Sequence, residues 1–188
     1  MKKITTVVVL SILSILLACA CAAKPAAPTS TTTVVPPTET TFLTGAFSKK
    51  DLVFSYGGKD VTLLSDVQPL LQVLGEEYSV TAAPSCMFTG EDKRFTYPAF
   101  DIFTYPIDGQ DQIDEIVVTD TVFVTARGVS VGDSYDSVVA AYGDGEFDEV
   151  VLTYLDPAED PDKSPRLIFG IDEGVVTYIS YYSARNMW

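Results

Sequence analysis

The chain of 188 residues contains no histidine. This absence excludes Ser-His-Asp and Cys-His catalysis, histidine metal ligands and the usual general base near neutral pH. We therefore expect a protein that is not an enzyme and that uses no metal or other cofactor. One alternative is an enzyme acting on cell-wall glycans, because glycoside hydrolysis needs only two carboxyl groups.

Positive charge is also scarce. The sequence has 12 Lys and Arg against 26 Asp and Glu, which gives a formal net charge of -14. Nucleic-acid binding needs basic side chains facing phosphates, so this composition argues against a nucleic-acid partner. It argues equally against electrostatic attachment to anionic lipid. An acidic surface favours solubility, and it also suits docking with a basic protein.

The chain lacks an apolar run long enough to cross a membrane comfortably. The run at residues 7–17 is interrupted by serines and falls short of the about 20 apolar residues that a helical span needs. Two lysines precede this run and the small residue Ala18 follows it. Residues 1–18 therefore have the three parts of an export signal.

The segment Leu16-Leu17-Ala18-Cys19 resembles the lipobox of bacterial lipoproteins. In that family the cysteine is acylated and becomes the new N-terminus, so the resemblance implies lipid attachment at Cys19 and a lipid membrane as a partner. Two or more acyl chains give stable attachment. The expected location is extracytoplasmic: the outer face of the membrane in a Gram-positive cell, or the outer membrane in a Gram-negative one.

Two other interpretations of the leader remain open. An ordinary secretory signal would be cut near Ala20 or Ala23, and Cys21 is a weaker candidate for acylation. Residues 19–46 are rich in Thr, Pro and Ala, a composition typical of a disordered tether. We expect this tether to hold a folded head away from the membrane.

The stretch at 127–143 organises the head: a short strand, a Gly-Asp-Ser helix start, an amphipathic helix and a glycine stop. A fainter copy lies at 58–75, and a shift of 68 places Gly75 on Gly143. The same shift aligns two stripes with i, i+3, i+4, i+7 spacing. These stripes are Val67, Leu70, Leu71 and Leu74 in one copy, and Tyr135, Val138, Val139 and Tyr142 in the other.

These copies predict an α+β fold of two tandem units, 47–119 and 120–188, each with a helix on an antiparallel sheet. In the first unit Ser65 is the expected N-cap with Gln68 as its capping-box partner, and Gly75 is the expected end of the helix. A Gly-Gly turn at 57–58 predicts a hairpin. Further strands are expected at 78–82, 94–97, 100–105, 112–118, 150–155, 166–171 and 175–182.

The order of a Gly-Val-x-Val-Gly-Asp-Ser segment, a helix, Tyr-Gly and a meander of strands resembles small lipoproteins of the SmpA/OmlA (BamE) type. It also resembles the tandem units of β-lactamase inhibitor protein (BLIP). The motifs Ser85-Cys86-x-Phe88-x-Gly90 and Tyr97-x-x-Phe100-x-Ile102-x-Thr104-Tyr105-Pro106 are similar to uncharacterised lipoproteins of Gram-positive anaerobes. These resemblances imply a BLIP-like interaction module and transfer no catalytic residue or specific partner.

Two local patterns could carry chemistry. Cys86, the only cysteine of the head, has no histidine to activate it, so we expect a partly buried structural thiol rather than a nucleophile. The acids at 108–115 are spaced somewhat like a calcium loop but lack the full alternation and the final glutamate, so a solvated turn leading into a strand is expected.

Aromatic residues are frequent in the predicted strands. Alternation sends Phe100 and Ile102 to one face and Phe103 and Tyr105 to the other. We expect a protein-binding face on the side without helices, since tyrosines on an open sheet suit recognition; tyrosines that merely fill the edge of a thin core are the alternative. The residues predicted for this face are Phe103, Tyr105, Tyr154, Tyr178 and Tyr182.

The resulting functional hypothesis is an exported, membrane-anchored lipoprotein with a non-catalytic protein-binding or structural role in the cell envelope. An inhibitor of an extracellular hydrolase is a further alternative, because of the likeness to β-lactamase inhibitor protein and the acidic charge.

Overall fold

The structure, a computed structural model, describes residues 41–156 and 160–185. The predicted export signal, Cys19 and most of the predicted tether lie outside these residues. The elements in chain order are η1 (Lys49–Leu52), β1 (Phe54–Tyr56), β2 (Lys59–Val61), α1 (Gln68–Leu74), β3 (Ser79–Pro84), β4 (Glu91–Thr96), β5 (Phe100–Ile107), β6 (Gln110–Val118), α2 (Tyr135–Tyr142), β7 (Glu146–Asp148), β8 (Val151–Leu155), β9 (Arg166–Asp172) and β10 (Val175–Tyr182).

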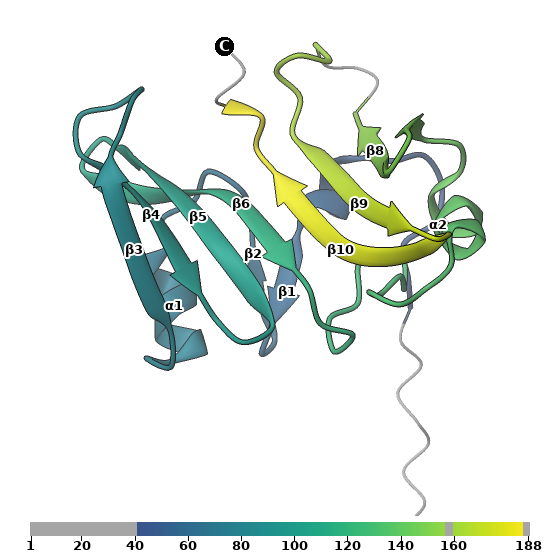
Figure 1. The fold of residues 1–188 in the computed structure, drawn as a ribbon, viewed down its shortest axis with the longest axis horizontal. Coiled ribbons are helices and arrows are strands. Elements are labelled where there is room, and N and C mark those ends of the chain that lie inside the picture. The colour runs from purple at the N-terminus through teal and green to yellow at the C-terminus, as the bar shows by residue number, and fades with distance from the viewer. Residues whose placement is uncertain (1–40, 157–159, 186–188) are drawn as a thin grey trace, which may run out of the picture. The chain divides into compact units, whose positions relative to one another are not determined.

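Eight of the strands form one antiparallel sheet in the order β3-β4-β5-β6-β10-β9-β8-β7, and β1 pairs with β2 as a separate hairpin. The predicted α+β class and antiparallel meander are therefore confirmed. The two predicted units share this sheet, because β6 pairs with β10. Figure 1 shows α1 and the β1–β2 hairpin behind strands β4 to β6.

The core lies on the side of the sheet that carries the helices. Along β5, Phe100, Ile102 and Thr104 are buried while the residues between them are only half-buried, which is the alternation of a sheet with one covered face. Directly paired residues lie on the same face of a sheet. They form a helix-side row across seven strands: Val80, Phe95, Ile102, Ile116, Tyr181, Leu167 and Tyr154.

Helix α1 begins later than predicted. Its N-cap is Val67, and the N–H of Gln68 donates a hydrogen bond to the carboxylate of Asp66 at 3.0 Å. Ser65 instead donates its hydroxyl to the C=O of Thr62 at 2.7 Å, so the predicted Ser65–Gln68 capping box is wrong. The reason is tertiary, because residues 64–67 pair with the start of β6 before the helix can begin.

Both helices end as predicted, at glycines with nearly the same geometry. Gly75 has φ 80° and Gly143 has φ 82°, a left-handed conformation that glycine adopts without the steric cost of a Cβ. A tyrosine from the following strands donates to each glycine carbonyl: Tyr97 to Gly75 at 3.1 Å, and Tyr154 to Gly143 at 2.8 Å. Each helix end is therefore fixed to the sheet in the same way.

The segments before the two helices also pair alike with the last strand of each half. In the first half the N–H groups of Leu64 and Val67 donate to the C=O groups of Ile113 and Asp111. In the second half, the N–H groups of Gly132 and Tyr135 donate to Val176 and Gly174. The donors in the two halves are related by the shift of 68 found in the sequence.

Irregularities of the sheet also recur. The β5–β6 pairing shifts register between Phe103 and Thr104, which leaves Asp114 unpaired in β6. The β9–β10 pairing shifts between Val176 and Tyr178, which leaves Thr177 unpaired in β10. Bulges of this kind bend a strand and redirect side chains. In both halves the bulge follows the residue that bonds to the segment before the helix.

Three details differ from expectation. The short strand predicted at 127–131 is a turn, in which Gly128 has φ 84° and its N–H donates to Thr125. Strand β7 was not predicted. The contacts of the head begin before residue 47, because the N–H of Leu43 donates to the C=O of Ala126 at 2.9 Å.

Candidate binding surface

The face of the sheet opposite the helices carries a continuous row of paired side chains. Its central members, Phe103, Glu115 and Tyr182, come from β5, β6 and β10. Figure 1 shows this face toward the viewer, with α1 behind the strands. We call this face the open face. The complete row is Thr81, Arg94, Phe103, Glu115, Tyr182, Arg166 and Leu155.

Four of the five residues predicted for a binding surface lie on the open face. Phe103, Tyr105, Tyr178 and Tyr182 are half-buried. Tyr105 lies beside Phe88, with ring centroids 5.5 Å apart. Tyr178 lies flat over the backbone of Gly170, where a Cβ would come within 2.0 Å of its ring. These aromatic rings are therefore held in place while one side remains accessible.

The prediction for Tyr154 is wrong. Its side chain is only 5% exposed and belongs to the helix-side row, where it packs against Tyr142 and Phe169 with centroid separations of 5.1 and 6.0 Å. Almost every residue of β8 is apolar, so the sequence does not show which set of side chains faces the core. The packing beneath α2 selects the set that contains Tyr154.

The first half of the open face is hollowed into a cavity of about 380 Å³, which we call the acidic cavity. Carboxylates from two strands line it: Asp92 from β4, and Asp114 and Glu115 from β6. Phe103 and Tyr105 contribute the aromatic part of its wall. The bulge at Asp114 accounts for two neighbouring acids on β6 reaching the same cavity, since neighbours in a regular strand point to opposite faces.

Burial makes Asp114 a weaker acid than an ordinary aspartate. The residue is only 4% exposed, and this desolvation raises its pKa from 3.8 to about 6. The hydroxyl of Ser183 donates to Oδ1 of Asp114 and opposes the shift, whereas the charges of Glu115 and Asp92 add to it. Asp114 therefore changes its charge in the range between mildly acidic and neutral pH.

Burial also raises the pKa of Glu115, although the hydroxyl of Ser180 donates to its Oε1 at 2.6 Å and lowers it. Beside these acids, Arg94 pairs with Asp101 at 2.7 Å, and its guanidinium lies 5.3 Å from the ring centre of Phe103. The charge of Arg94 is thus already compensated. The acidic cavity suits a cationic group that also presents apolar surface.

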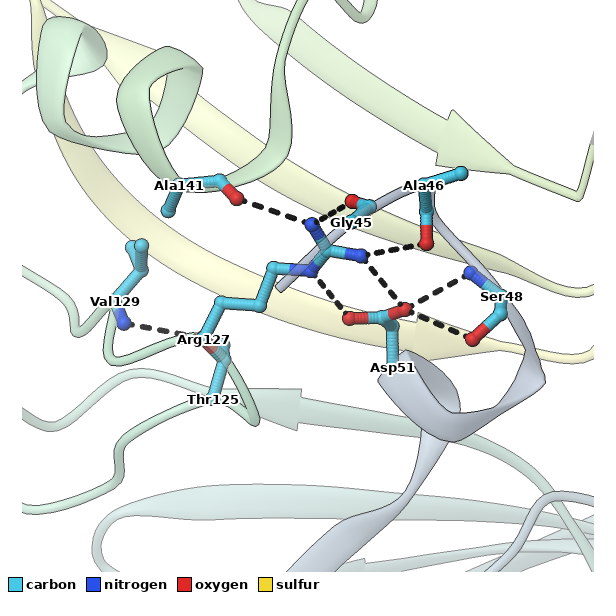
Figure 2. Close-up of polar contacts among 8 residues, drawn as sticks. All are labelled: Gly45, Ala46, Ser48, Asp51, Thr125, Arg127, Val129 and Ala141. Atoms are coloured by element: carbon cyan, nitrogen blue, oxygen red, sulfur yellow. Dashed lines mark hydrogen bonds and ion pairs between the residues drawn. The ribbon is translucent and has the colours of Figure 1, made fainter. Parts of the chain in front are cut away.

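A buried ion pair that the sequence does not predict joins Arg127 to Asp51 of η1, next to the end of α2. Figure 2 shows Arg127 donating both Nε and Nη2 to the carboxylate of Asp51, at 2.6 and 3.1 Å. Its remaining donors reach the C=O groups of Gly45, Ala46 and Ala141. All five donors of the guanidinium are therefore used, and the side chain is only 3% exposed.

This cluster is structural in character. Ser48 donates its N–H to the same carboxylate at 2.9 Å, and the guanidinium lies 4.9 Å from the ring centre of Tyr142 (Figure 2 shows the polar contacts). The cluster joins residues 45–51 to the end of α2, and it leaves no N–H of Arg127 free to bind a ligand. The sequence offered one signal, an arginine before a glycine in an acidic chain, and no indication of its partner.

The remaining sequence candidates have simpler outcomes. Asp108 and Gly109 form a turn, and residues 110–115 lie in β6, as expected for a turn that leads into a strand. Within 41–156 and 160–185, no group of three or more acidic or cysteine side chains is arranged to hold a metal ion. Cys86 is exposed and free, so the expected partial burial is wrong. Its loop is held by the hydroxyl of Ser85, which accepts from the N–H groups of Met87 and Phe88, and by the N–H of Ser85, which donates to the C=O of Gly90 at 3.0 Å; these contacts leave the thiol exposed.

In the part of the chain that the structure describes, neither helix has the length and hydrophobicity that a membrane crossing requires. No known protein-family model matches the chain, and no curated protein matches it. Among solved structures the chain is similar to the uncharacterised protein YfeY of Escherichia coli, with 15% sequence identity and a TM-score of 0.35. That similarity covers 64% of this chain and 92% of YfeY. A TM-score this low does not establish a shared fold.

Proposed function

We propose that this protein is an exported lipoprotein, anchored by an acylated Cys19, that binds another protein of the cell envelope without catalysing a reaction. The observation that carries the binding role is the open face. It holds fixed aromatic rings beside a cavity lined by Asp92, Asp114 and Glu115. Rigid aromatic anchors next to desolvated charges are typical of protein-recognition surfaces.

The anchor rests on the sequence Leu16-Leu17-Ala18-Cys19. We expect Cys19→Ala to release the protein from the membrane or to leave it unprocessed, whereas Cys21→Ala should behave as the natural chain does. Membrane fractionation with mass spectrometry of the N-terminus measures both. Mature Cys19→Ala protein in the membrane fraction would show that the anchor is wrong.

We further propose that the head is a tandem, BLIP-like repeat within the α+β class. The support is the recurrence of three features in both halves: the pairing before each helix, the tyrosine bonded to each glycine stop, and the bulge in each last hairpin. Duplicated modules of this kind present one wide sheet surface to a partner.

The binding role is tested by cross-linking and affinity capture from envelope extracts of the source organism with the full-length protein. We expect a specific partner to be lost when Phe103 and Tyr182 are both changed to Ala. Val122→Ala is the control, since Val122 is 68% exposed and lies in the loop between β6 and α2, outside the strands that form the open face. Equal capture of the partner by both variants would show that the open face is not the binding surface. A captured extracellular hydrolase that loses activity on binding would assign the inhibitor role.

A carboxylate enzyme acting on cell-wall glycans is a second candidate, because Asp114 has a pKa of about 6 next to a second acid. Its test is turnover of purified wall polymers by the natural chain and by Asp114→Asn. Turnover that disappears in Asp114→Asn would favour the enzyme over the binding role.

A further inference from the structure

Strand β3 forms one edge of the sheet, and its structure differs from that of a protected edge. All six of its residues are exposed, and none is charged. Among the described residues no strand pairs with its outer side. Natural edge strands are commonly blocked by charges, prolines, bulges or short length, and of these β3 has only the terminal Pro84. At the other edge, β7 has three residues, and two of them are acids.

Cavities lie on both sides of β3. The acidic cavity reaches Thr81 and Ala83 on the open face. A second cavity of about 590 Å³, which we call the helix-side cavity, reaches Val80 and Ala82 between α1 and the sheet. Successive side chains of a strand point to opposite faces. A strand added beside β3 would therefore place alternate side chains over the two cavities.

The two cavities differ in chemistry. The acidic cavity is lined by three buried or half-buried carboxylates, beside Arg94, which is paired with Asp101, and Oδ1 of Asp92 is buried without a hydrogen-bond partner among the described residues. The helix-side cavity has an apolar wall of Leu71, Val80 and Phe95. Its own carboxylates are exposed, as in Glu76 and Glu91, or paired, as in Asp111. Its only lysine, Lys93, is already paired with Asp111 at 2.8 Å. One side of β3 thus suits basic side chains and the other suits apolar ones.

We propose that β3 binds an extended segment of a basic partner protein by strand addition, with Lys or Arg side chains in the acidic cavity and apolar side chains in the helix-side cavity. Main-chain hydrogen bonds to the strand edge supply affinity, and the two cavities supply specificity. Six residues span about 20 Å, so about three side chains of the partner reach each side. This inference rests on the proposed binding role and adds its site and the chemistry of its partner.

A second copy of this chain is a poorer occupant. Two copies joined through β3 would bring their acidic cavities together, and each chain has a formal net charge of -14. Like charges brought together at an interface oppose association. A basic segment instead gains from the same field.

The test uses the full-length protein in non-ionic detergent and fluorescence anisotropy of blocked, labelled heptapeptides. The first peptide alternates lysine and valine, and the second has the same composition in paired order, so that its lysines fall on both sides of a strand. We expect binding of the alternating peptide to be roughly tenfold tighter, because only its lysines can all face the buried and half-buried carboxylates of the acidic cavity. Equal affinities would overturn the proposal.

Backbone pairing is tested with two N-methylated forms of the alternating peptide, one methylated at odd positions and the other at even positions. In an extended strand the N–H groups of alternate residues point to opposite edges. Strand addition therefore predicts that one form loses binding and the other keeps it. Retention of binding by both forms would overturn the proposal even if every protein variant failed to fold.

On the protein side, Val80→Lys is matched with Val122→Lys. Both positions are exposed, at 52% and 68%, and both variants add the same charge. We expect only Val80→Lys to weaken binding, by roughly tenfold, since the lysine lies where the partner strand must approach. Equal weakening by both variants would mean diffuse charge attraction and would overturn the proposal.

Other outcomes separate this inference from the function on which it rests. Loss of the natural partner in the Phe103 and Tyr182 variant, without any peptide selectivity, would leave the binding role standing and refute the β3 site. Self-association that Val80→Lys abolishes, without peptide binding, would assign β3 to a second copy and refute the basic segment.

Discussion

The two halves of the sheet have the same order of elements, and they differ clearly at the start of each repeat. In the second half Arg127 is buried and makes five hydrogen bonds around Asp51 and the end of α2. The position related to it by the shift of 68 is Lys59, which makes one exposed bond to the C=O of Pro69 at 3.0 Å. The start of the second repeat is therefore fixed by a buried ion pair to Asp51, whereas among the described residues Lys59 makes no such pair.

The difference continues at the outer edges. Beneath α2, Tyr142, Tyr154 and Phe169 pack together, and the sheet ends in the short strand β7. Beneath α1, the sheet extends into β3, with a cavity on either side. The same framework thus ends in a short acidic edge in the second half and in a long uncharged edge in the first. This contrast teaches that duplication preserves the backbone pairing while the edge strands and their side chains differ between the halves.

The largest effect is expected at Arg127. Arg127→Met should lower the free energy of unfolding by about 3–5 kcal/mol, because it leaves the buried carboxylate of Asp51 uncompensated. Lys59→Met should change it by less than about 0.5 kcal/mol, since that side chain is at the surface. Urea denaturation followed by circular dichroism measures both. Similar losses for the two variants would remove the asymmetry between the halves.

An effect of intermediate size is expected at Asp114. Its pKa is raised in the folded protein to about 6, so its contribution to stability is full below its ordinary pKa of 3.8 and is lost as the pH rises through 6. Asp114→Asn stays neutral and should be more stable than the natural chain by about 2–3 kcal/mol at pH 8, with little difference at pH 3.

Thermal unfolding from pH 3 to pH 8 tests this expectation. The groups that act on Asp114 are Ser183, Glu115, Asp92 and Arg185. Ser183→Ala should raise the pKa of Asp114 further, since its hydrogen bond lowers that pKa. A stability difference between Asp114→Asn and the natural chain that does not change with pH would contradict the raised pKa.

The smallest effect compares the two helix ends. Tyr154→Phe and Tyr97→Phe each remove a hydroxyl that donates to a glycine carbonyl, and each should cost about 1 kcal/mol. Equal costs would show that the two helix ends are equivalent in energy as well as in geometry. A cost at Tyr154 alone would mean that only the second half depends on this bond.

Much of the fold could be predicted from sequence because its signals are local. The glycine stops at 75 and 143, the hairpin turn at 57–58 and the alternation of β5 each depend on a few neighbouring residues. The start of α1 could not be predicted, because long-range pairing with β6 overrides a good local cap at Ser65. The exposure of Cys86 likewise depends on a loop that little of the chain covers.

The candidate surface was predicted only in part, for a related reason. Phe103 and Tyr105 alternate with clear core residues in β5, so their face could be read from the sequence. Tyr154 lies in an apolar strand with no such contrast, and its face depends on what packs above it. The acidic cavity needs a bulge at Asp114 and a neighbouring strand, neither of which has a signal in the sequence.

The sequence by itself determined the repeated order of helix and strands and the end of each helix, since turn geometry and side-chain periodicity are properties of short segments. Only the tertiary structure decided that Arg127 pairs with Asp51, that the sheet ends at one edge in the short acidic strand β7, and that β3 remains exposed between two cavities. Those outcomes depend on contacts between residues far apart in the chain, and such contacts form only when the whole core packs.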